Sequence, residues 1–156
     1  PIKFREWSLR QDSGGVGENR GGLGAVYEIE LLEEEAKAFI FGERSKFAPP
    51  GVVGGGDGAL NKFSYEHQNE FKSPPLASKM VNISLFKGQA VRLETPGGGG
   101  YGKAYKRKID SVLNDVKLEY ISTALASSEY GVVINDEGEV DEGKTFASRE
   151  KIRQTR

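Results

Sequence analysis

Residues 95–102 read Thr-Pro-Gly-Gly-Gly-Gly-Tyr-Gly, and this stretch divides the chain into two parts of different periodicity. Four glycines after a proline do not form a regular element, because glycine carries the largest ordering entropy and proline removes a backbone donor. Before the stretch, apolar residues alternate with polar ones, as in half-buried strands. After it, Ile109, Val112, Leu113 and Val116 follow the spacing of an amphipathic helix. The sequence therefore predicts a mainly β, α+β fold of antiparallel sheets with long glycine-rich loops and two or three C-terminal helices.

The length of 156 residues favours one domain. We expect residues 1–105 to form a glycine-looped antiparallel β region and residues 106–156 to form a C-terminal helical region packed on it. The chain opens with Pro1 rather than methionine and passes directly into a strand pattern. It therefore resembles a fragment of a larger subunit.

The β region contains several expected strands. Ile2 and Phe4 share one phase, while Trp7 and Leu9 share the other, which predicts a strand with a bulge near residues 5–6. The apolar run at 36–41 follows a strand at 26–31 closely, and the alternating runs at 81–85 and 91–95 flank a Lys-Gly turn. Sequence proximity predicts a hairpin in each case. Residues 61–76 suggest only short strands.

The helical region also carries end signals. Ser122 can cap a second short helix, and Gly131 can adopt the left-handed conformation that closes it. Residues 132–134 suggest a short strand, and residues 141–156 a charged, solvent-exposed helix.

Charge and composition exclude several classes of function. Lys and Arg total 22 against 23 Asp and Glu, so the net charge of -1 gives no field for nucleic acid or anionic lipid. There is no cysteine, which excludes a disulfide framework, a thiolate zinc site and a cysteine nucleophile. No apolar run is long enough to cross a membrane, and no signal peptide is recognisable. We expect a cytoplasmic protein that binds neither nucleic acid nor membrane.

Glycine is unusually frequent, at 21 residues, and it is clustered. Bare backbone N–H groups can form nests for phosphate, but neither the cluster at 54–58 nor that at 97–102 ends in the Gly-Lys-Ser/Thr of a P-loop. An independent phosphate-binding domain is thus a minor alternative. Sharp turns and close backbone contacts explain the glycines better.

Single polar residues give weaker signals. His67 is the only histidine, so a histidine-rich metal site is excluded, and we expect it to be an exposed side chain. Glu28 and Glu30 lie on the outer phase of a strand and are expected to be solvated. Arginines and one lysine beside the loops could pair with a carboxylate or phosphate; these are Arg20, Arg44, Lys46 and Arg92.

The ordered set of glycine loops is more specific than any one of them. The blocks at 12–17, 20–24, 49–56, 94–102 and 130–133, in this order, resemble the C-terminal region of the hydantoinase B/oxoprolinase family. The resemblance covers residues 1–142, and the stretch at 95–102 is its most distinctive part. The usual Asp-Pro helix start of the family is replaced here by Lys-Ile at 108–109, which removes a helix cap but leaves the apolar stripe.

The resemblance implies part of an ATP-dependent cyclic amidase that opens hydantoin or 5-oxoproline rings. In such enzymes an A-type partner is thought to use ATP to activate the substrate carbonyl, and the B-type subunit to complete ring opening. ATP and a divalent metal are expected for the full enzyme, and neither is expected to be bound by this segment. The expected partners are the remainder of the B-type subunit and an A-type subunit, in an oligomer.

No catalytic or metal-ligating residue is therefore assigned, and the expected role of the loops is to shape the active site or a subunit interface. A non-catalytic interaction or scaffold module that retains the family fold is the alternative. The candidate pocket residues lie in or beside the loops; they are Arg20, Gly21, Gly22, Arg44, Gly55, Gly56, Thr95, Gly97, Gly98, Gly99, Gly100 and Tyr101.

Overall fold

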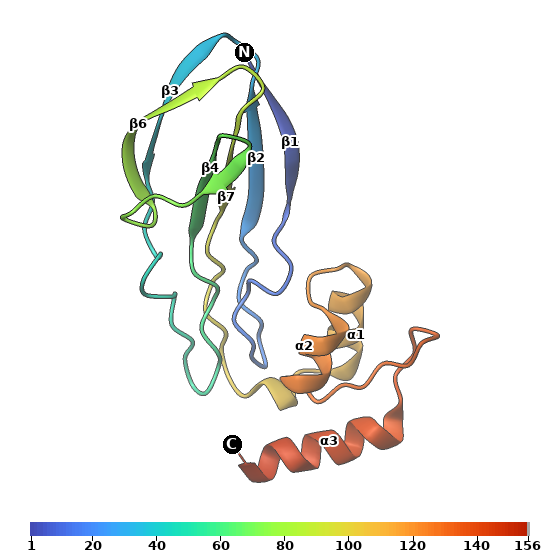
Figure 1. Ribbon diagram of the computed structural model, residues 1–156. Coiled ribbons are helices and arrows are strands. Elements are labelled where there is room, and N and C mark those ends of the chain that lie inside the picture. Colours follow the sequence, from blue (N-terminus) through green and yellow to red (C-terminus); the bar gives the residue numbers. More distant parts are fainter. Residues whose placement is uncertain (156) are drawn as a thin grey trace.

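The computed structural model describes residues 1–155 and shows a β region joined to a smaller group of helices (Figure 1). The strands are β1 (Ile2–Leu9), β2 (Ala25–Leu31), β3 (Glu35–Phe41), β4 (Lys62–His67), β5 (Glu70–Lys72), β6 (Lys79–Phe86) and β7 (Ala90–Glu94). The helices are α1 (Ile109–Lys117), α2 (Thr123–Ser128) and α3 (Glu142–Thr155), and a short 3-10 turn, η1 (Ala104–Lys106), precedes α1. The predicted fold class is confirmed.

The main sheet has five antiparallel strands in the order β1-β2-β7-β4-β5. The register of β1 on β2 shifts between Phe4 and Glu6, which confirms the predicted bulge. Beyond the bulge, Trp7 lies opposite Tyr27, just as Phe4 lies opposite Ile29 before it. The irregularity therefore keeps the apolar residues of β1 on one face of the sheet.

The remaining strands, β3 and β6, pair with each other in a separate two-stranded ribbon. Both predicted hairpins are therefore wrong. β2 is hydrogen-bonded to β1 and β7 on its two edges, and β7 to β2 and β4, so neither has a free edge for its neighbour in sequence. β3 and β6 leave the main sheet and cover part of its apolar face.

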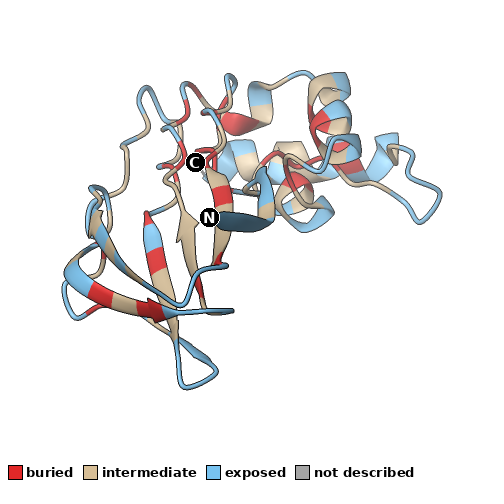
Figure 2. Ribbon diagram, turned by 90° about the horizontal axis from the view of Figure 1, so that it is seen from above, coloured by how far each residue is buried: buried red, intermediate tan, exposed pale blue. Residues whose placement is uncertain are grey.

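The core of the β region lies between ribbon and sheet. Its buried members are Leu31, Phe63, Ile83 and Leu85, and half-buried residues of β3, β4, β6 and β7 pack against them. Figure 2 shows these buried positions in the ribbon and the adjoining strands. The alternation of apolar residues in each strand supplies this face.

The helices enclose a second core. Val112, Ile121, Ala126, Tyr130 and Val132 are fully or almost fully buried there together with Ala104, and Val16 from the β region packs against them. The Ser122 hydroxyl accepts the Leu125 N–H at 3.0 Å, which confirms the predicted cap. Gly131 has a positive φ of 64°. The strand expected at 132–134 does not form; Ile134 makes only an isolated bridge to Val140.

The structure also places the predicted C-terminal helix at α3, but this helix is not wholly exposed to solvent as expected, because Thr145 is buried and Arg149 is half-buried against the other helices. None of the helices within residues 1–155 is both long and apolar enough to span a membrane.

Candidate functional site: a glycine bundle joined to the helices

The glycine-rich segments all leave the same end of the main sheet (Figure 1). Residues 10–24 connect β1 to β2, residues 42–61 connect β3 to β4, and residues 95–103 follow β7. Apart from isolated bridges they lie outside regular helices and strands. Because their parent strands lie close together, the segments 13–24, 49–59 and 96–102 run side by side, and we call them the glycine bundle.

Backbone hydrogen bonds cross-link the glycine bundle. The Gly15 N–H donates to the Gly98 carbonyl at 2.8 Å, and the Gly98 N–H donates to the Gly22 carbonyl at 2.9 Å. The third segment joins through Gly56, whose N–H donates to the Val16 carbonyl at 2.7 Å and whose carbonyl accepts from Gly100 at 2.9 Å. These N–H groups are therefore used by the fold and are not presented to an anion.

The glycines are required because the backbones touch. A Cβ on Gly97 would overlap the Ser13 carbonyl oxygen, a Cβ on Gly21 that of Gly98, and one on Gly99 that of Pro50. Gly22 differs, because nothing lies within 4 Å of the place its Cβ would occupy, and it is exposed. The bundle therefore has an interior closed to side chains and an outer surface where one could be added.

The structure brings most of the predicted site residues together in this bundle, with Thr95 directly before its last segment: Arg20, Gly21, Gly22, Gly55, Gly56, Gly97, Gly98, Gly99, Gly100 and Tyr101. The Thr95 hydroxyl accepts the Ala25 N–H at 2.7 Å, so it fixes the start of β2. Arg44 lies elsewhere, in a hollow of about 500 Å³ that also includes Phe47 and Leu76.

One end of the bundle exposes apolar side chains. Tyr101 is 50% exposed and forms backbone bridges with Asn19 and Val52. Val53 is 68% exposed and has a positive φ of 54°, in a turn closed by the Gly55 N–H and the Val52 carbonyl. A β-branched residue in this left-handed conformation is strained.

A buried ion cluster joins the bundle to the helices. Asp115 of α1 is 4% exposed, and its carboxylate accepts from Arg20 Nε at 3.1 Å and from Arg107 Nη2 at 2.9 Å. The Arg20 guanidinium also lies over the Tyr120 ring, 5.4 Å from its centroid. Arg20 belongs to the bundle segment and Asp115 to the helices, so the pair fixes one against the other.

Tyr130 lies fully buried beside this cluster. Burial raises the pKa of its hydroxyl, against the opposing effect of the nearby Arg107 charge. Neither the Tyr130 hydroxyl nor Arg107 Nε has a hydrogen-bond partner within the described residues. Arg149 of α3 donates to the backbone carbonyls of Tyr130 at 3.1 Å and Arg107 at 2.7 Å, and burial lowers the pKa of its guanidinium.

Asp115 and Arg107 were not among the site residues predicted from the sequence. The signal for Asp115 was present, because it stands three residues after Val112 and therefore falls on the apolar face of the predicted helix. A carboxylate at such a position requires a cationic partner. Which arginine supplies it was not evident from spacing along the chain.

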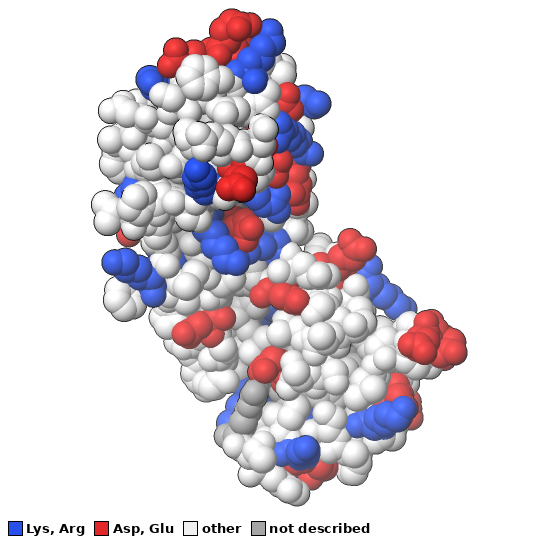
Figure 3. Space-filling model, viewed as in Figure 1, with Lys and Arg blue, Asp and Glu red and all other residues white. Residues whose placement is uncertain are grey.

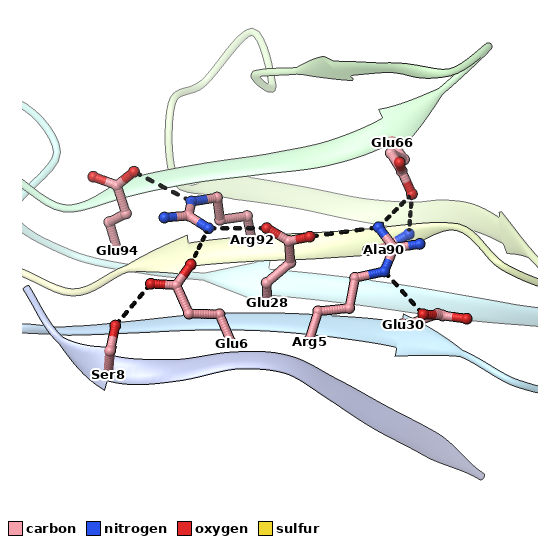
Figure 4. A network of polar contacts seen from close by, with 9 residues as sticks. All are labelled: Arg5, Glu6, Ser8, Glu28, Glu30, Glu66, Ala90, Arg92 and Glu94. Carbon is pink, nitrogen blue, oxygen red and sulfur yellow. Dashed lines mark hydrogen bonds and ion pairs between the residues drawn. The ribbon is translucent and has the colours of Figure 1, made fainter.

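A second polar network covers the face of the main sheet opposite the core (Figure 4). Arg92 donates to Glu6 at 2.6 Å and to Glu28 at 2.9 Å, and Arg5 donates to Glu30 at 2.9 Å. Hydrogen bonds from Ser8 and then Arg92 hold the pKa of the Glu6 carboxyl below its usual value. Glu28 and Glu30 are therefore paired with arginines, not simply solvated.

The ionic groups of both networks pair mainly with one another. Within residues 1–155 no three His, Asp or Glu side chains gather in an arrangement that could hold a metal ion. His67 is exposed, as expected. Figure 3 shows acidic and basic side chains interspersed over the viewed face, without a large field of one sign. The most distinctive feature of the described chain is the glycine bundle, in which backbone packs directly on backbone.

Comparison with known proteins gives relatives that share this segment. An uncharacterized protein of Methanocaldococcus jannaschii is 41% identical over 86% of this chain and 23% of its own length. Caprolactamase subunit beta of Pseudomonas jessenii is 33% identical over 96% of this chain and 26% of its own length. The chain thus spans about a quarter of the length of these relatives.

Solved structures agree with the fold. The ATP-dependent caprolactamase of Pseudomonas jessenii superposes with a TM-score of 0.82 at 33% identity, over 96% of this chain and 26% of that one. A nucleotide-free acetone carboxylase superposes with a TM-score of 0.84 over 99% of this chain and 25% of that one; at 21% identity this likeness concerns the fold alone. The family model described as hydantoinase B/oxoprolinase matches residues 1–104. The chain belongs to the hydantoinase B/oxoprolinase family.

Proposed function

We propose that this chain is the C-terminal part of the B-type subunit of a cytoplasmic, ATP-dependent cyclic amidase that opens a hydantoin or 5-oxoproline ring. The main support is the match to the caprolactamase, which has this fold over 96% of the chain at 33% identity and is described as ATP-dependent. A lactam, a hydantoin and 5-oxoproline each contain a cyclic amide. Opening of a cyclic amide is therefore the reaction that the names of these relatives have in common.

The residues of this chain do not fit a site for ATP or a divalent metal. The bundle N–H groups of Gly15, Gly56, Gly98 and Gly100 donate to carbonyl groups of the bundle. No triad of His, Asp or Glu suited to a metal occurs within residues 1–155. In this proposal both groups are therefore held by the remainder of the B-type subunit and by an A-type partner, within an oligomer.

The role proposed for this segment is to form a rigid wall of the active site or of the subunit interface. Backbone packed on backbone leaves no side-chain rotamers to adjust, so the surface of the bundle is defined to within small displacements. Positioning of this kind affects rates strongly, because a displacement of about 1 Å can reduce turnover by about a hundredfold. Gly22, Gly98 and Tyr101 present that surface.

The test adds a side chain to the surface without disturbing the interior. Gly22→Leu is made in the complete B-type subunit, assembled with its A-type partner, and ATP-dependent ring opening is assayed with hydantoin, 5-oxoproline and caprolactam. We expect turnover or subunit association to fall about tenfold or more, with the melting temperature unchanged. The matched control is Gly143→Leu on the exposed side of α3, where a Cβ meets only Asp141 Oδ1, at 3.7 Å.

The alternative is a non-catalytic interaction or scaffold module. The observation that favours it is that no group of three His, Asp or Glu side chains suited to a metal ion occurs within residues 1–155. Such a module predicts that Gly22→Leu leaves ring opening unchanged in every assay. That outcome would contradict the proposed wall.

A further inference from the structure

The surface of β1 carries an apolar strip that nothing in the described chain covers. The strip consists of Ile2, Phe4, Trp7 and Leu9, which are 58%, 42%, 68% and 55% exposed. Phe4 and Trp7 pack in a tilted arrangement with their ring centroids 4.9 Å apart, and Trp7 and Tyr27 pack edge to face with their centroids 5.4 Å apart. Contiguous apolar patches of this kind on a soluble protein mark interaction sites.

The β-bulge makes the strip continuous. In an unbroken strand Ile2 and Phe4 would face one side, and Trp7 and Leu9 the other. The register shift between Phe4 and Glu6 brings all four to the same side. The bulge therefore gives this eight-residue strand one wholly apolar face. A strand with both faces exposed to water does not need such a face.

The strip continues the face of the sheet that forms the core. Ile2 lies opposite Leu31, which is buried under the β3–β6 ribbon, and Trp7 lies opposite Tyr27. The ribbon has two strands against five in the main sheet, so it covers only part of that face. Figures 1 and 2 show the ribbon at one side of the sheet and β1 at the other.

The opposite face of β1 is already satisfied by ion pairs. Arg5 pairs there with Glu28 and Glu30, and Glu6 pairs with Arg92. A face of paired charges is compatible with water, whereas the strip is not. β1 also forms the end of the sheet, so its outer backbone edge lacks a neighbouring strand within the described chain.

We propose that the β1 strip is the docking surface for an apolar segment of the larger B-type polypeptide, which completes the second layer over β1. The inference rests on the proposed function, since it requires that this chain be part of such a polypeptide. The relatives supply the occupant, because about three quarters of the caprolactamase chain lies outside the region that this fold occupies. An added layer can both cover the strip and pair with the β1 edge.

The test uses two neighbouring positions on β1 in the complete B-type subunit without ATP, substrate or A-type partner. Leu9→Cys reports the strip, and Ser8→Cys reports the polar face of the same strand; both residues are exposed in the described chain, which has no cysteine of its own. Modification by a water-soluble thiol reagent is followed by peptide mass spectrometry in buffer and in denaturant. We expect the Leu9→Cys thiol to react about a hundredfold more slowly in the native subunit than in denaturant, and the Ser8→Cys thiol to react almost freely.

Three results would overturn the inference. The first is equally fast modification at both positions. The second is protection at Leu9→Cys that disappears on dilution as copies dissociate, which would assign the strip to a second copy. The third is protection that arises only when the A-type subunit is added. Because no ring opening is measured, failure of this inference is distinguishable from failure of the proposed function.

Discussion

The backbone of Gly97 lies directly against that of Ser13, so that a Cβ on Gly97 would overlap the Ser13 carbonyl oxygen. These residues are 84 positions apart in sequence and come from the loops that follow β7 and β1. The contact therefore forms only when both β1 and β7 are paired in the main sheet. Glycine is the one residue that permits it.

Gly21→Ala should strongly destabilise the chain, whereas Gly22→Ala should not. A methyl group on Gly21 would overlap the Gly98 carbonyl oxygen, and one on Gly22 would meet open space. We expect Gly21→Ala to lower the free energy of unfolding by about 3 kcal/mol. Thermal and urea unfolding of the two variants side by side measure the difference, and equal midpoints would show that the bundle is not packed as described.

Asp115→Ala should be costly because it leaves two arginines without their carboxylate. Arg20 and Arg107 side chains are only 14% and 17% exposed. Removing one partner of a buried ion cluster costs about 3 kcal/mol or more. The control on the same helix is Asp110→Ala, at an exposed position where only a small helix-dipole effect is expected. Equal urea midpoints for the two variants would contradict the role of the cluster.

Val53→Asn should stabilise the chain. Val53 has a φ of 54°, a conformation that asparagine adopts with less strain than a β-branched residue. Its side chain is exposed, so little packing is lost. We expect a gain of about 1 kcal/mol in the free energy of unfolding. Val52→Asn, at the exposed neighbouring position, is the control and should give no gain.

Tyr130→Phe should reduce the loss of stability at alkaline pH. Burial raises the pKa of the Tyr130 hydroxyl above its ordinary value of 10.0. As the pH rises through 10.0, the unfolded chain loses this proton before the native chain does, so the free energy of unfolding falls until the raised native pKa is passed. The contribution of the neutral, buried Tyr130 phenol to stability is thus fully present below the pKa that this phenol has in the unfolded chain.

The substitution removes that dependence and, because the hydroxyl has no partner within the described residues, loses no hydrogen bond. Urea midpoints between pH 8 and about 11 measure the slope for both proteins. An alkaline slope as steep in Tyr130→Phe as in the parent chain would show that this hydroxyl is not the responsible group.

The sequence by itself determined the local structure and the family. Alternation placed most strands, the i, i+3, i+4, i+7 spacing placed α1, and the bulge near Arg5 followed from the change of phase in β1. The ordered glycine blocks identified the family because each depends on backbone geometry that other residues do not adopt. Ser122 was recognised as a cap for the same local reason.

Only the tertiary structure decided which strands pair and what the loops do. Residues 36–41 and 81–85 are as suited to a local hairpin as to the ribbon they form, because alternation specifies a face and not a neighbour. The separation of Arg44 from the other candidates, and the meeting of Arg20 with Asp115 across 95 positions, likewise depend on the path of the whole chain. Periodicity is a property of neighbouring residues, whereas edge pairing and buried charge are properties of segments brought together by folding.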